Sequence, residues 1–182
     1  MSGIGKWVVA AAGAVVLGMM MNTVPNYNSS FQPAKVFADE GGVGDSSLFH
    51  AQLIGLKTAG TIAYQSFGQE ISRDTSATFL VAELTVTGRS SSRQLQAIWL
   101  GSTGRQYNQS GRLQNAPRDL SARAVEPGLT DRAIAIFELP EDEIVGGKLG
   151  LMPRGVTAGG IIMHFSGPDT LPQKQAMLRL EP

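Results

Sequence analysis

The chain has 182 residues, and its 15 Lys and Arg residues balance 15 Asp and Glu residues, so the formal net charge is zero. Without a polybasic stretch it lacks the electrostatic signature of nucleic-acid binding, and we expect no nucleic-acid partner. The sequence has no cysteine, which excludes thiol nucleophiles, zinc ribbons and iron–sulfur ligation.

The most apolar segment lies at the N-terminus. Residues 7–21 carry no charge, are mostly apolar and follow the single basic residue Lys6. As a helix this run spans only ~22 Å, against ~30 Å of bilayer hydrocarbon. Uncharged flanks extend its reach, because Ile4 precedes Lys6 and the next charged residue is Lys35. We therefore predict a transmembrane or signal-anchor helix over residues 7–24, which would attach the protein to a membrane.

The single lysine also predicts the topology of this anchor. The positive-inside rule places residues 1–6 in the cytoplasm and everything after the anchor outside. A cleaved signal peptide is the alternative, since Val36-Phe37-Ala38 provides small residues for cleavage, although Ala38 lies far beyond Met21. A buried or interfacial helix is a third interpretation. We expect a single-pass protein of the cytoplasmic membrane with its C-terminal domain outside, or a secreted protein if the segment is cleaved.

Residues 25–46 contain little that could pack. Asn, Ser, Pro and Gly dominate this stretch, which ends in Asp39-Glu40-Gly41-Gly42 and Gly44-Asp45. Such a composition is typical of a flexible linker. We expect it to tether a single domain over residues 47–182, which is long enough to fold around its own core.

The domain has the pattern of β-strands. Residues 77–87 alternate between an apolar face and a partly polar face, and residues 94–100 and 131–139 repeat this alternation. Shorter strands are predicted at residues 49–56, 61–64, 105–107, 120–125, 148–152, 161–165 and 176–180. Gly and Pro turns separate the strands, starting with Gly60, and one helical turn is expected after Pro140. The spacing predicts an all-β antiparallel sandwich or small barrel.

The order of strand and turn motifs resembles a known family. In chain order these motifs are Leu80–Thr87, Ile98-Trp99-Leu100, Gly104-Arg105-Gln106-Tyr107, Val125-Glu126-Pro127-Gly128, Ile134–Pro140 and Lys148-Leu149-Gly150-Leu151. They resemble the DUF4352 family of bacterial lipoproteins and membrane-anchored proteins, related in fold to a secreted mycobacterial antigen. The resemblance covers residues 48–182. It implies an immunoglobulin-like antiparallel β-sandwich outside the cytoplasmic membrane, and the family has no established catalytic residues to carry over to this chain.

Two features depart from the family pattern. Members often reach the membrane through a lipidated cysteine, which this chain lacks, so a helix must replace it. Gly88 stands where the family has an asparagine after its strand, and it still permits a turn. The family signatures have structural explanations, since Pro127-Gly128 makes a reversing turn and Pro140 ends a strand. Such signatures specify a fold rather than a reaction.

No residue pattern indicates a catalytic or metal site. Gly44-Asp45-Ser46 resembles the nucleophile motif of some esterases, but it precedes the first predicted strand. His50 and His164 lack neighbouring ligands at metal-binding spacing, and we expect each to be an edge or hydrogen-bonded core residue. The densest acidic cluster is expected to be a solvated loop rather than a Ca²⁺ site, because it lacks the Asp-x-Asp spacing of a calcium loop; it comprises Glu138, Glu141, Asp142 and Glu143. We predict no metal and no cofactor.

The residues around the predicted 101–106 hairpin are candidates for recognition. Trp99 shares a side with Leu95 and Ala97, so we expect it in the core. Arg105 and Tyr107 would contact a partner if the loop exposes them, since arginine and aromatics dominate binding hot spots. We predict a non-enzymatic binding module of the bacterial envelope, with an envelope protein as its expected partner. The alternatives are an accessory subunit of an envelope complex, a secreted ligand-binding protein and an envelope hydrolase.

Overall fold

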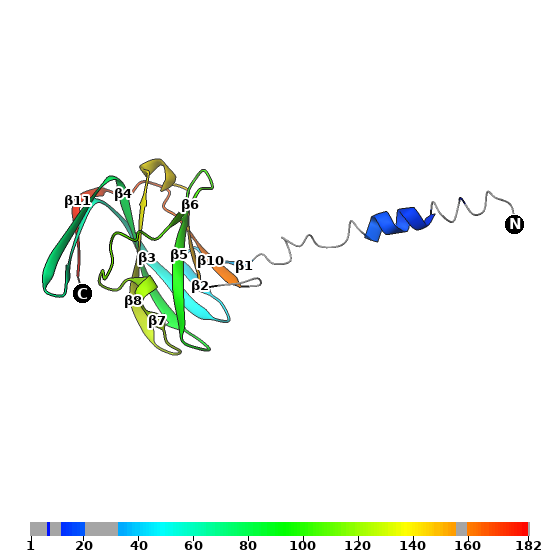
Figure 1. The fold of residues 1–182 in the computed structure, drawn as a ribbon, viewed down its shortest axis with the longest axis horizontal. Helices are drawn as coiled ribbons and strands as arrows, with labels where there is room; N and C mark the ends of the chain where they lie inside the picture. Colours follow the sequence, from blue (N-terminus) through cyan, green and yellow to red (C-terminus); the bar gives the residue numbers. More distant parts are fainter. Residues whose placement is uncertain (1–6, 8–11, 21–32, 156–159, 182) are drawn as a thin grey trace.

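The computed structural model describes residue 7 and residues 12–20, 33–155 and 160–181, which form a β-sandwich and a helical N-terminal segment (Figure 1). Residue 7 and residues 12–20 are helical, and their apolar side chains are exposed. None of the helical segments in these ranges is both long and apolar enough to cross a bilayer. The predicted anchor over residues 7–24 lies partly outside the described residues, because 8–11 and 21–24 are not among them.

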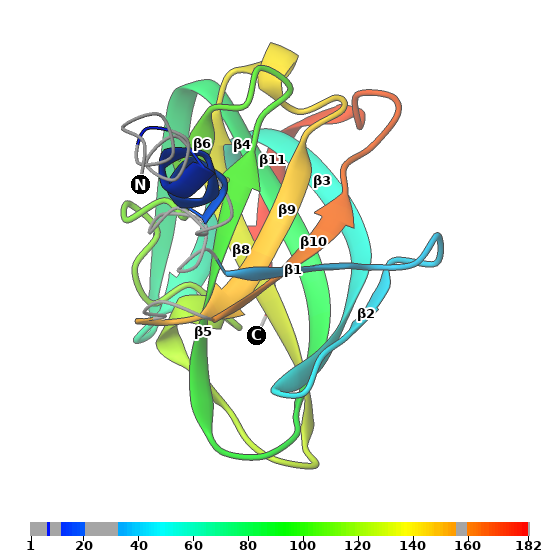
Figure 2. The ribbon, with the colours of Figure 1, turned by 90° about the vertical axis from the view of Figure 1, so that its right-hand side faces the viewer.

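The first sheet has the strand order β1-β10-β9-β5-β6. Its strands are β1 (Ala34–Phe37), β10 (Ile161–Ser166), β9 (Lys148–Pro153), β5 (Arg93–Leu100) and β6 (Gln106–Asn108), and the short β7 (Ala124–Val125) also pairs with β5. All pairings are antiparallel except that of β1 with β10. Figure 2 shows the outer side of this sheet, with β10 between β1 and β9.

The second sheet has the strand order β11-β3-β4-β8. It consists of β11 (Lys174–Leu180), β3 (Phe49–Ser66), β4 (Gln69–Gly88) and β8 (Thr130–Leu139), and β2 (Val43–Asp45) pairs with the start of β3. β11 runs parallel to β3, and the other strands are antiparallel. Two single 3₁₀ turns lie between strands, η1 (Leu120–Ala122) and η2 (Glu141–Glu143). The second turn confirms the helical turn expected after Pro140.

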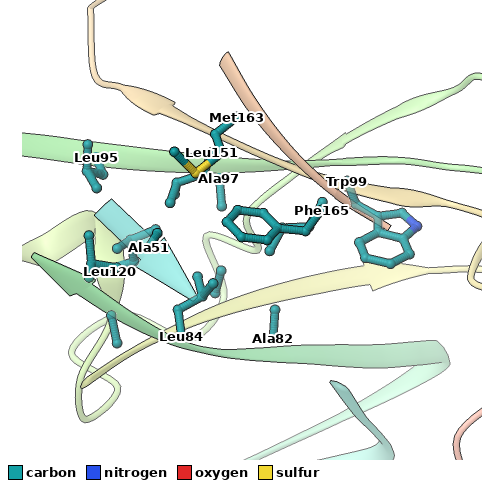
Figure 3. Packing of buried hydrophobic residues seen from close by; sticks show 14 of the residues in the cluster. Ala51, Ala82, Leu84, Leu95, Ala97, Trp99, Leu120, Leu151, Met163 and Phe165 are labelled. Atoms are coloured by element: carbon teal, nitrogen blue, oxygen red, sulfur yellow. The ribbon is translucent and has the colours of Figure 1, made fainter. Parts of the chain in front are cut away.

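The two sheets enclose a main core, in which side chains from both layers point toward one another (Figure 3). The predicted alternation is confirmed here: the buried face of β4 contributes Leu80, Ala82, Leu84 and Val86. Trp99 is fully buried, and its indole N–H donates a hydrogen bond of 2.9 Å to the carbonyl of Glu143. Its ring lies 6.2 Å from that of Phe137, in the tilted geometry that aromatic pairs favour.

A second core lies on the outer face of the second sheet. Its side chains come from β3, β4, β8, β11 and the loop after β6, and they are Ala59, Ile62, Tyr64, Phe79, Val81, Leu113, Ala116, Ile134, Ile136, Leu178 and Leu180. The β3–β4 pairing is interrupted here, because Ala59 pairs with Phe79 but Thr61 pairs with Asp74. Four residues of β4 (75–78) therefore lie opposite Gly60 alone. The hairpin beyond this irregularity leaves the main sandwich and encloses the second core (Figure 1).

The linker prediction is wrong for the second half of its range. Residues 34–37 and 43–45 are strands of the sandwich rather than part of a tether, and residues 25–32 lie outside the described residues. β1 is held because Val36 packs against the main core, and the turn to β2 is closed by the Asp39 carboxylate, which accepts a 2.8 Å hydrogen bond from the Val43 N–H. The folded domain therefore starts near residue 34 rather than at residue 47.

Two strand predictions also differ from the structure. The predicted strands 49–56 and 61–64 are one continuous strand, because Gly60 marks an irregularity inside β3 instead of a turn. The predicted strand 120–125 is the turn η1 followed by the two-residue β7. Asp119 causes this difference, since its side chain accepts a hydrogen bond from the Ser121 N–H and caps the turn.

Candidate functional site

The four acidic residues of the predicted cluster have separate structural roles. The Glu138 carboxylate accepts hydrogen bonds from Thr75 and Arg112, and that of Glu141 accepts one from Lys174 at 2.6 Å. Asp142 contributes its carbonyl oxygen to a bond with the Ser102 hydroxyl. In the described parts of the chain, no group of three or more His, Cys, Asp and Glu side chains is placed to hold a metal ion.

Glu143 is not part of a solvated loop, so that prediction is wrong for this residue. Its side chain is buried, and its carboxylate accepts hydrogen bonds from both the backbone N–H and the hydroxyl of Thr103. These bonds hold the pKa of Glu143 below its usual range, although burial acts in the opposite direction. Glu143 thus fixes the 101–104 turn onto η2.

Ser46 and His50 have structural roles at the start of β3. The Ser46 hydroxyl donates a 2.7 Å hydrogen bond to the Phe49 carbonyl and accepts bonds from the N–H groups of Leu48 and Phe49. It therefore stabilises the β2–β3 turn. His50 lies at the surface, with its Nδ1 3.8 Å from an Asp45 carboxylate oxygen.

His164 differs from the expected edge or hydrogen-bonded histidine. It lies on the inner strand β10, only 7 % exposed, and its buried Nδ1 has no hydrogen-bond partner. Its ring stacks on Phe37 of β1 at a centroid distance of 5.5 Å. Burial lowers the pKa of His164, and the nearby charges of Lys35 and Lys148 lower it further. Nothing in the sequence indicates this environment, because β1 lies within the predicted linker.

Arg105 and Tyr107 occupy different environments. Arg105 is exposed before β6, whereas Tyr107 is half-buried and packs against the main core. Tyr107 pairs with Trp99 across β5 and β6, which explains why its ring turns toward the sandwich. Tyr107 therefore stabilises the fold, and contact of either residue with a partner stays a prediction.

The most unusual surface of the described chain is the end of the β3–β4 hairpin. We call residues 64–70, together with residues 179–181 beside them, the hairpin end. Ser66 pairs with Gln69, so Phe67 and Gly68 form a two-residue turn. Both have positive φ angles, +50° and +79°, as type I′ hairpin turns require. Asn, Asp or Gly usually occupies the first of these positions, and a bulky aromatic residue there is strained.

No packing interaction within the fold compensates for the strain at Phe67. Its side chain is 93 % exposed and belongs to neither core. Strained residues of this kind cluster at binding sites and active sites. An exposed aromatic ring at the end of a projecting hairpin is therefore a candidate contact for another molecule.

A cavity of about 370 Å³ lies beside this turn, lined by Tyr64, Gln65, Phe67, Gly68, Glu70, Arg179, Leu180 and Glu181. The ring of Tyr64 and the side chain of Leu180 are largely buried and give it an apolar base. Arg179 and Glu70 form an exposed ion pair of 2.9 Å at its border. Its volume is at the low end for small-molecule sites, and it can accept an apolar side chain of a partner.

The second core positions this site. The Tyr64 hydroxyl donates a 2.8 Å hydrogen bond to the Gln114 carbonyl in the loop that fills the hairpin. Burial raises the pKa of Tyr64, so the phenol stays protonated and keeps this bond. The sequence contains one signal for the site, because Phe67-Gly68 separates two strand-like runs as a two-residue hairpin turn does.

No protein-family model and no curated protein matches the sequence. Two solved structures are similar to it. One is an uncharacterized β-sandwich protein from Clostridium difficile 630, with 10% identity, 74% of this chain and 95% of that chain covered, and a TM-score of 0.47. The other is described as "a putative lipoprotein" from Staphylococcus aureus, with 11% identity, 79% and 97% covered, and a TM-score of 0.49. Neither similarity bears on the function of this chain.

Proposed function

We propose that this protein is a non-enzymatic binding module that the N-terminal segment holds at the outer side of the cytoplasmic membrane, and that it docks a partner protein through its hairpin end. The observation that carries the proposal is Phe67, an exposed aromatic residue kept in a strained turn beside a cavity. Neither the stability nor the packing of the sandwich explains this residue. Contact with another protein would explain it.

The N-terminal segment supports the membrane attachment. Its described helical residues expose apolar side chains, among them Trp7, Val16, Leu17 and Met19. A helix that is apolar all round is expected in a membrane or a protein interior. Lys6 at its start favours a cytoplasmic N-terminus and an outer sandwich. Membership of the DUF4352 family belongs to the same proposal, supported by the motifs named above.

The composition of the hairpin end favours a protein as the partner. Phe67, Tyr64 and Arg179 belong to residue types that are enriched in protein interfaces, and Tyr and Arg are also enriched in binding hot spots. An apolar partner side chain in the cavity would bury the ring of Phe67, which is exposed to solvent in the free protein. We expect the partner to be an envelope protein, because the sandwich would face that compartment.

Site-specific crosslinking tests this proposal in the native cell. A photoreactive phenylalanine derivative is placed at position 67 of the full chain, and, as a control, at the exposed Leu129 on another loop. We expect one envelope protein to be attached at position 67, and to be absent from the control. Equal patterns at the two positions, or no adduct at position 67, would overturn the proposal.

A further inference from the structure

β11 is an open edge of the second sheet. It pairs with β3 on one side, and no described strand or loop forms backbone hydrogen bonds with its other side. In a parallel pair every other residue directs its N–H and C=O groups away from the neighbouring strand. The seven residues Lys174–Leu180 therefore present a row of unpaired backbone groups.

The other edges of the described sheets are shorter, covered or more highly charged. β1 has four residues and β6 has three. The outer edge of β8 is covered by the 109–119 loop, where the Ser110 N–H donates to the Ile136 carbonyl and the Ile134 N–H donates to the Arg118 carbonyl. The hairpin part of β4, residues 69–77, also has an open outer side, because β8 pairs only with Thr78–Thr87. That edge carries Glu70, Arg73 and Asp74, so β11 is the less charged of the two long open edges among the described strands.

Native proteins usually protect such an edge with proline, charged residues or a bulge. In β11 only the first residue and the sixth, Lys174 and Arg179, are charged. Between them Met177 is 51 % exposed. The four residues between these charges, 175–178, carry none, and an edge with such an uncharged stretch is suited to strand addition.

The open edge leads directly to the hairpin end. Leu180 at the end of β11 pairs with Tyr64, and both line the cavity beside Phe67. An extended chain lying along β11 would reach this cavity without leaving the edge. We propose that β11 accepts an extended segment of the partner protein as an additional strand, with an apolar side chain of that segment in the cavity. This inference rests on the proposed function and specifies how the partner binds.

The side chains of β11 favour another protein over a second copy of this chain. In a symmetric antiparallel pair centred on Met177, each Arg179 would face Gln175 and each Leu180 would face Lys174. Such a pair brings no acidic side chain opposite Lys174 or Arg179, whose ion-pair partners Glu141 and Glu70 lie on other elements. A partner strand with an apolar residue opposite Met177 and an acidic residue opposite Arg179 would match both positions.

A peptide selection tests strand addition directly. The full chain in detergent micelles is screened against displayed random peptides of about twelve residues, which is long enough to pair along β11. We expect a selected peptide to slow amide hydrogen exchange at alternate residues of 174–180 by about tenfold or more. Met177→Lys should weaken its binding about tenfold. Leu129→Lys changes a similarly exposed side chain and should leave binding unchanged.

Several outcomes would overturn the inference. β11 would be excluded as the acceptor if the peptide slowed amide exchange on other strands instead. It would also be excluded if the Met177→Lys protein bound the peptide as well as the natural chain, or if no peptide were selected. Protection that rises with protein concentration alone would show that a second copy occupies the edge. If the crosslink at position 67 persists in the Met177→Lys protein, docking at the hairpin end stands and strand addition does not.

Discussion

Replacing Phe67 by asparagine should stabilise the protein while abolishing docking. A bulky residue in a sparsely populated backbone region costs about 1–3 kcal/mol, whereas asparagine is well tolerated at the first position of a type I′ turn. Because Phe67 is 93 % exposed, removing its ring exposes little buried surface and lowers the free energy of unfolding by at most ~0.5 kcal/mol. The net expected gain in the free energy of unfolding is about 1 kcal/mol, or roughly 2–4 °C in Tm.

The assay compares urea denaturation of Phe67→Asn and Phe67→Ala with their retention, in a pull-down without crosslinking, of the partner identified by the crosslink at position 67. Alanine also removes the ring, but its Cβ keeps most of the strain at positive φ, so its stability should stay close to that of the natural chain. Both variants should lose the partner. Equal or lower stability of Phe67→Asn would refute the strain argument, and undiminished capture by both variants would refute the role of the ring.

Three further predictions concern the parts of the fold that support the site. Gly147→Ala should destabilise the protein by about 1–3 kcal/mol in a urea titration, because the new Cβ would lie 2.7 Å from Trp99 Nε1. Gly111→Ala is the neutral control in the same titration, since its Cβ would meet nothing within 4 Å. Tyr64→Phe should cost about 1 kcal/mol and accelerate amide exchange in the 109–119 loop, which loses its hydrogen bond from the phenol. His164 should make stability fall in acid: its pKa is lowered in the folded state, so the unfolded chain binds the extra proton, and stability declines as the pH falls below about 6.5. His164→Leu should flatten this decline between pH ~7 and ~5, and identical acid profiles of the two proteins would contradict the assignment.

The sequence predicted the main sandwich because its central strands are long and face a core on at least one side. In β4 the alternation of Leu80, Ala82 and Leu84 with Phe79 and Val81 was visible without any knowledge of the partners. Each set faces a different core, so the period of two survives on both faces. The assignment of Trp99 to the core followed from the same alternation and is confirmed.

The short strands at the edges could not be predicted in this way. β1 buries little besides Val36, and it depends on parallel pairing with β10, more than 120 residues later in the chain. A four-residue strand with one inward side chain has no detectable period. The environment of His164 was missed for the same reason, since it exists only when Phe37 covers the imidazole.

The hairpin end was missed because exposure is a tertiary property. The dipeptide Phe67-Gly68 indicates a turn, but nothing local shows that the flanking strands leave the sandwich. That departure depends on the pairing break opposite Gly60 and on the loop that fills the second core. Residue type favours Arg105 and Tyr107 instead, and the structure turns Tyr107 toward the main core.

The positions of β1 and the hairpin end suit a protein that is held at one point and binds at another. The chain reaches the sandwich at β1, an edge strand of the first sheet, whereas the hairpin end and β11 belong to the second sheet and lie on the far side of the sandwich (Figure 1). A sandwich attached through β1 could therefore bind a partner without releasing its attachment. The main core, which includes Trp99, is closely packed between the two sites. The sandwich therefore holds the hairpin end in a fixed position relative to β1. The strain at Phe67 fits this arrangement, since the turn can be destabilised locally while the second core holds the hairpin in place.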